Sequence, residues 1–203
     1  MGNFLEAISD LFGPRDEEGL KKIAAQFGGQ YQKRELRMEY GGVAALYDLA
    51  AVGMRDAVDT RVRAEFPTGA SFHLVVSGPA GSAFSYSRHG WQANAESKKY
   101  DELPVDGQLF RGLELHGTDG ETAAGLFDEE TARLLRRSGL HTLQIHCGHG
   151  HGTFLFMIGG SVSDPDRFGE IHRLLGSLFG RMTEKGLAGA GSAGRSSDGG
   201  ENE

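Results

Sequence analysis

The residues with the clearest capacity for chemistry lie in one short stretch, residues 141–160, which holds four histidines and the only cysteine of the chain. Cys147, His149 and His151 alternate with glycines, so an extended backbone places their side chains on one face, with neighbours about 7 Å apart. Imidazole nitrogen and thiolate sulfur are ligands that zinc prefers. The spacing predicts a metal site of Cys147, His149 and His151, with His146 as a further candidate ligand and Zn²⁺ as the candidate ion.

A second interpretation of the same stretch is an ordinary exposed turn. Two apolar runs, residues 140–146 and 153–158, flank the glycines and predict the two strands of a β-hairpin. Histidine is polar and tolerates the irregular backbone of a turn. The stretch contains no HExxH motif, no CxxC pair and no carboxylate, so both interpretations stay open.

The sequence assembles no recognisable catalytic set. No Gly-x-Ser-x-Gly elbow occurs, and a Ser-His-Asp triad cannot be inferred from residue counts. An intact hydrophobic pattern without such a set favours a non-enzymatic accessory or protein-interaction domain, whose partner is another protein or a second copy of the chain. The alternative is a metal-binding protein or metalloenzyme that uses residues 146–151.

Charge and composition exclude several classes of partner and location. The chain has 203 residues and a formal net charge of -7, and its basic residues are dispersed among acids, so we expect no nucleic-acid binding. No apolar run is long enough to span a membrane, which predicts no membrane insertion. A single cysteine and the lack of a basic, then apolar, N-terminal leader favour the cytoplasm.

Hydrophobic periodicity divides the chain into three parts. Residues 1–15 are predicted to form a short amphipathic helix and a linker. Residues 16–185 are predicted to form one α+β domain, which starts with a helix capped by Asp16. Residues 186–203 consist mainly of Gly, Ala, Ser and acidic residues, a composition that predicts a disordered tail.

Four segments of the first half show strand patterns. Residues 30–40 alternate apolar and charged side chains and end at two glycines that suit a tight turn. Residues 43–54 fit either a helix or a strand, and the flanking glycines favour a strand. Residues 60–66 and 72–76 alternate on either side of a Pro-Thr-Gly turn, which predicts that these two strands pair with each other.

Residues 77–108 show little periodicity, and loops of this length tend to be mobile or functional. Their aromatic side chains could line a ligand groove, although aromatics in long loops more often anchor the loop to the core. This set comprises Phe84, Tyr86, Trp91 and Tyr100.

The second half predicts a strand over residues 109–115, a helix capped by Asp128, the hairpin, and a long helix that begins at Asp164-Pro165. The fold class is therefore α+β, an antiparallel sheet with helices packed on it, one of them a long C-terminal amphipathic helix. This layout resembles uncharacterised bacterial α+β domains of unknown function, some of which are attached to membrane helices. The resemblance covers about residues 28 to 185, rests on spacing and implies no catalytic residues.

Overall fold

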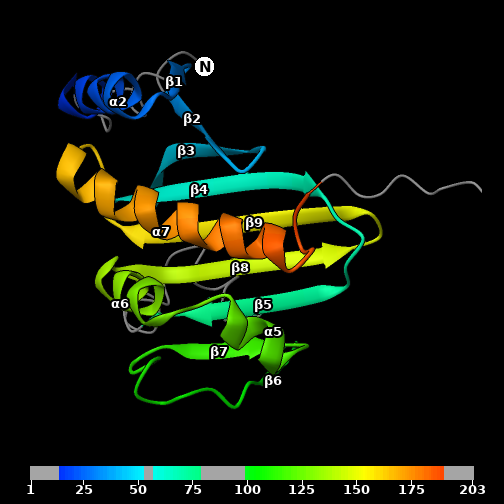
Figure 1. Cartoon of the computed structure of the whole chain (residues 1–203). Helices are drawn as coiled ribbons and strands as arrows, with labels where there is room; N and C mark the ends of the chain where they lie inside the picture. The colour runs from blue at the N-terminus through cyan, green and yellow to red at the C-terminus, as the bar shows by residue number, and fades with distance from the viewer. Residues whose placement is uncertain (1–13, 53–56, 79–98, 190–203) are drawn as a thin grey trace, which may run out of the picture.

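The protein forms a nine-stranded antiparallel sheet with its helices packed on one face (Figure 1). The computed structural model describes residues 14–52, 57–78 and 99–189. In chain order the elements are α2 (Pro14–Phe27), β1 (Gln30–Gln32), β2 (Glu35–Tyr40), β3 (Val43–Val52), β4 (Ala57–Pro67), β5 (Phe72–Ser77), β6 (Asp101–Glu102), β7 (Glu114–Gly117), α5 (Gly120–Gly125), α6 (Glu129–Arg137), β8 (Leu140–Gly148), β9 (His151–Gly159) and α7 (Pro165–Glu184). The α+β prediction is confirmed.

The strand order, β1-β2-β3-β4-β9-β8-β5-β7-β6, interleaves the two halves of the chain. The predicted strand at residues 43–54 is confirmed over 43–52. The predicted pairing of residues 60–66 with 72–76 is wrong, because the β8–β9 hairpin lies between β4 and β5 and bonds to both. The turn after β4 is therefore a crossover between non-adjacent strands.

Helix α7 lies across the sheet and supplies much of the core (Figure 1). Its predicted apolar stripe is confirmed, and all seven positions are buried: Phe168, Ile171, Leu174, Leu175, Leu178, Phe179 and Met182. The predicted start is confirmed too, since the Asp164 carboxylate accepts hydrogen bonds from the backbone N–H groups of Asp166 and Arg167. Asp128 caps α6 in the same way.

Helix α2 packs beside α7 on the edge strands β1 and β2. Leu20, Ile23 and Ala24 are buried there, as their spacing predicts. Asp16 is not the N-cap, because the helix already begins at Pro14. The Asp16 carboxylate instead accepts hydrogen bonds from the hydroxyls of Ser161 (2.8 Å) and Ser163 (2.9 Å), which tie α2 to the segment between β9 and α7.

Two further segments differ from the sequence prediction. Residues 109–113 form turns and not a strand, because Asp106 accepts a hydrogen bond from the Gln108 N–H (2.8 Å) and starts a turn that buries Phe110. The predicted disordered tail starts too early. The N–H of Leu187 bonds to the Met182 carbonyl at 2.8 Å and its side chain is buried, so residues 186–189 continue the packed structure.

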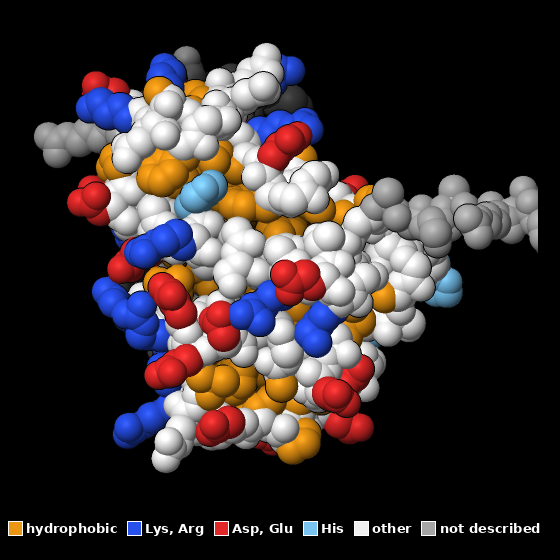
Figure 2. Space-filling view, viewed as in Figure 1, with side chains coloured by type: hydrophobic (Ala, Val, Ile, Leu, Met, Phe, Trp, Pro, Cys, Tyr) orange, Lys and Arg blue, Asp and Glu red, His pale blue; other side chains and the backbone are white. Residues whose placement is uncertain are grey.

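The centre of the sheet is buried on both faces. Val75, Thr142, Gln144 and Met157 point away from the described helices, yet all four are buried. On the helix face, charged side chains of both signs are interspersed, and hydrophobic side chains reach the surface beside α2 and α7, with a histidine among them (Figure 2).

Some sequence predictions lie outside the described residues. They are the helix within residues 1–13, the tail beyond residue 189, and residues 79–98 of the long loop with three of its four aromatics. None of the described helices is both long and apolar enough to cross a membrane.

Candidate functional site

The predicted metal ligands of the hairpin do not share one face. Strands β8 and β9 are joined by His149 and Gly150, whose φ angles of 54° and 81° form a tight two-residue turn. The chain therefore reverses direction between Gly148 and His151, whereas a shared face of Cys147, His149 and His151 requires an extended backbone. His149 and His151 are exposed, and His146 lies on the face opposite the helices.

Cys147 points into the core on the helix side of the sheet, where its thiol contacts the Leu187 carbonyl oxygen at 3.7 Å. Burial raises the pKa of this thiol, which disfavours the thiolate that binds metals. Within the described ranges, no three His, Cys, Asp or Glu side chains form a group arranged to hold a metal ion. A metal at the hairpin tip stays a prediction, and Cys147 lies on the face opposite to His146 and His151.

A different set of polar side chains does converge, where α7 crosses the first strands. The Tyr40 hydroxyl contacts the Tyr47 hydroxyl and lies 2.8 Å from Nδ1 of His172. Burial raises the pKa of both phenols, so both are neutral. It lowers the pKa of His172, so neutral imidazole is favoured as well.

These neutral groups fix the direction of the hydrogen bonds. Tyr47 is fully enclosed, and its hydroxyl proton would be unpaired unless it donated to Tyr40. Tyr40 then donates to Nδ1 of His172, which places the imidazole proton on Nε2. Nδ1 of His172 is thus engaged in the buried chain Tyr47–Tyr40–His172. The other ring nitrogen, Nε2, carries the proton and is the donor that His172 can offer to a partner.

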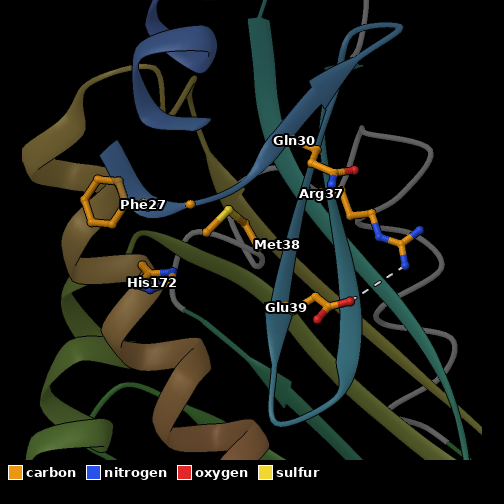
Figure 3. Close-up of a pocket in the computed structure, with 7 residues that line it drawn as sticks. Phe27, Gln30, Arg37, Met38, Glu39 and His172 are labelled. Atoms are coloured by element: carbon orange, nitrogen blue, oxygen red, sulfur yellow. Dashed lines mark ion pairs between the residues drawn. The ribbon is translucent and has the colours of Figure 1, made fainter. Parts of the chain in front are cut away.

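His172 also lines a pocket of about 400 Å³ at the edge of the sheet. The other lining residues come from the end of α2 and the start of β1 (Phe27, Gly28, Gln30) and from β2 (Arg37, Met38, Glu39). In Figure 3 the side chains of Phe27, Met38 and His172 gather on one side of β2, and those of Arg37 and Glu39 lie on the other. The pocket therefore has two apolar side chains and an imidazole on one side of β2 and charged side chains on the other.

The pocket lies where the edge of the sheet is incomplete. Strand β1 pairs with β2 only as far as Arg37, although β2 continues to Tyr40. Gly41 and Gly42 both have positive φ and form a two-residue turn, in which Tyr40 and Val43 exchange their backbone hydrogen bonds. Successive residues of a strand direct their backbone groups to opposite sides. Because Tyr40 bonds to β3, the backbone N–H and C=O of Glu39 point away from β3, towards the open edge beyond the end of β1.

A histidine–carboxylate pair lies at the far end of the central strands. Nε2 of His141 is 3.3 Å from Oδ2 of Asp59, and both side chains are largely buried. The other oxygen of Asp59 accepts a hydrogen bond from the Gly160 N–H. His141 occupies an irregularity in the pairing of β8 with β9, so the carboxylate anchors a break in the sheet.

The buried chain of Tyr47, Tyr40 and His172 is not among the sites that the sequence predicts. A signal for His172 was present, since it lies four residues after Phe168 and three before Leu175, both on the apolar stripe of α7. A histidine on such a stripe indicates a polar group at a packed interface. Nothing in the sequence indicated which strand it would face.

The chain matches no protein-family model and no curated protein. Among solved structures it is similar to the crystal structure of the mycobacterial trehalose monomycolate transport factor A, TtfA, with a TM-score of 0.52 and 10% sequence identity. The match covers 84% of this chain and 96% of that one. At this identity the likeness shows a shared fold alone.

Proposed function

We propose that this chain is a non-enzymatic accessory domain that binds an extended segment of a partner protein at the open edge of β2. The observation that carries the proposal is the pocket beside Glu39, where the sheet edge continues without a neighbouring strand from the described residues. An unpaired edge with a side-chain niche next to it is the arrangement by which extended peptides add to a sheet.

Main-chain groups supply the first part of this recognition. The outward N–H and C=O of Glu39 can exchange two hydrogen bonds with one residue of an extended segment. Only short edge strands tolerate such exposure without aggregating, and β1 protects the remainder of the edge.

Side chains supply the second part. A partner side chain that enters the pocket would contact Phe27 and the imidazole of His172. The Nε2–H donor of His172 favours a partner with a carbonyl or carboxylate oxygen at that point. TtfA, a protein of this fold, is named a transport factor, which accords with an accessory role and does not identify a cargo for this chain.

The test requires identifying the partner and then measuring its affinity. A photo-crosslinking amino acid at Gln30, beside the pocket, should give a discrete adduct in native cells. For the partner identified, Glu39→Pro should weaken binding about tenfold or more, because it removes one outward donor and leaves the partner's acceptor unpaired. Proline is tolerated at an edge position whose N–H faces outward, so the β2–β3 pairing should persist.

Glu39→Ala is the matched control, since it removes the side chain and keeps the backbone donor. Equal affinities of the two variants, or no adduct at Gln30, would contradict binding at this edge. Turnover of a defined substrate by the purified protein would contradict the non-enzymatic part of the proposal. A cytoplasmic location stays a prediction from the sequence.

A further inference from the structure

Two histidines meet on the sheet face opposite the helices, four strands away from the edge of β2. His73 of β5 and His146 of β8 are direct cross-strand partners. Their Nδ1 atoms lie 3.0 Å apart, and their ring centroids are separated by 5.3 Å. Both side chains are partly exposed, so a small ion can reach them from solvent.

A neighbouring aromatic residue holds this pair in place. The ring of Tyr100 stacks on His73 at 5.1 Å, with an interplanar angle of 15°. The Tyr100 backbone is itself positioned by His116, whose Nδ1 lies 3.3 Å from the Tyr100 carbonyl oxygen. The His73 ring is therefore packed against the Tyr100 ring, which reduces the side-chain entropy that His73 loses on binding a metal.

The separation of the two nitrogens suits two ligands of one ion. With metal–nitrogen bonds of about 2.0 Å, adjacent ligand nitrogens lie about 2.8 Å apart in a square-planar site and about 3.3 Å apart in a tetrahedral one. The value of 3.0 Å falls between these limits. Two neutral rings can both carry their proton on Nε2, which frees both Nδ1 lone pairs without net loss of a proton.

We propose that His73 and His146 form a two-histidine site for a divalent transition metal, Cu²⁺ or Zn²⁺, bound through Nδ1 of both rings with water in the remaining positions. Without metal, one ring donates its Nδ1–H to the other, and metal binding requires the rings to turn so that both Nδ1 lone pairs point at the ion. This site shares His146 with the metal site predicted at the hairpin tip. Its second ligand is His73, 73 positions before His146 in the chain, in place of Cys147, His149 and His151.

The experiment titrates the untagged full-length chain with Cu²⁺ and with Zn²⁺ by calorimetry. Wild type should bind one ion per chain. His73→Gln and His146→Gln should each weaken binding about tenfold or more, since each removes one of two protein ligands. His149→Asn is the control, because asparagine suits the left-handed backbone of the turn, and its affinity should stay within about twofold of wild type.

The variants separate the two metal hypotheses. If His149→Asn loses binding and His73→Gln keeps it, the metal is at the hairpin tip and this proposal is overturned. Equal binding by all variants overturns it as well. If a glutamine variant does not fold, the Cu²⁺ electron paramagnetic resonance spectrum of wild type decides: coupling to two equatorial nitrogens supports the pair, and coupling to fewer contradicts it.

Discussion

At the scale of single residues, His172 should make stability depend on pH. Burial against Phe27 and Phe168 lowers its pKa from the ordinary value of 6.5. As the pH falls below about 6.5, the unfolded chain takes up a proton at His172 that the folded chain does not, so the free energy of unfolding decreases towards acid. The maximum slope from one such group is about 1.4 kcal/mol per pH unit.

Urea unfolding at pH 7.5, 6.5 and 5.5 measures this slope. Carboxylates also contribute, so the comparison is with His172→Asn, whose side-chain oxygen can still accept the hydrogen bond from Tyr40. The variant should lose less stability than wild type between pH 6.5 and 5.5. Identical slopes would show that His172 takes up protons equally in the folded and unfolded chain, which would contradict a lowered pKa.

At the scale of secondary-structure elements, the first turn of α7 depends on one carboxylate. Asp164 accepts hydrogen bonds from the N–H groups of Asp166 (3.1 Å) and Arg167 (2.9 Å). Asp164→Ala should lower the free energy of unfolding by about 1 kcal/mol, because two N–H groups lose their partner. Asp164→Asn keeps the acceptor and should stay close to wild type. Equal losses in both variants would assign the effect to charge and not to capping.

Elements with a strong local signal were predictable from the sequence. The Asp164-Pro165 start and the apolar stripe of α7 predicted that helix, Gly41-Gly42 predicted the first turn, and the alternate glycines between residues 147 and 152 predicted the turn of the second hairpin. Residues 109–115 were not predictable in this way. Their apolar alternation is typical of a strand, but the Asp106 carboxylate competes for the backbone N–H groups and turns the chain.

The candidate sites were less predictable than the elements, because they depend on which strands are neighbours. Side chains alternate along a strand, so His146 and Cys147 lie on opposite faces of β8, but alternation cannot show that β5 brings His73 beside His146. The same limit applies to the Tyr40–His172 hydrogen bond, which joins residues 132 positions apart. Local periodicity carries no information about contacts at that separation.

At the scale of the whole molecule, the strand order should make folding one cooperative event. The hairpin β8–β9 bonds to β4 on one side and to β5 on the other, so it joins strands of the N-terminal half that do not touch each other. The C-terminal half lacks β5, which separates β7 from β8. The N-terminal half keeps β1–β4 as neighbours but loses α7, which supplies much of the core, so we expect fragments 1–78 and 99–203 to be unfolded when expressed separately.

Hydrogen exchange on the intact chain tests the same expectation without cutting it. Amides of β3 and β8, which belong to different halves, should exchange through openings of equal free energy, and denaturant should lower both by the same amount per molar. A lower opening free energy in β3 alone would mean that α2 and β1–β3 unfold as a separate unit. The variant His172→Asn separates the two cases, because His172 of α7 bonds to Tyr40 of β2. If α2 and β1–β3 unfold as a separate unit, the variant should lower the opening free energy in β3 and leave that of β8 unchanged. In a cooperative fold, the opening free energies of both strands should decrease together.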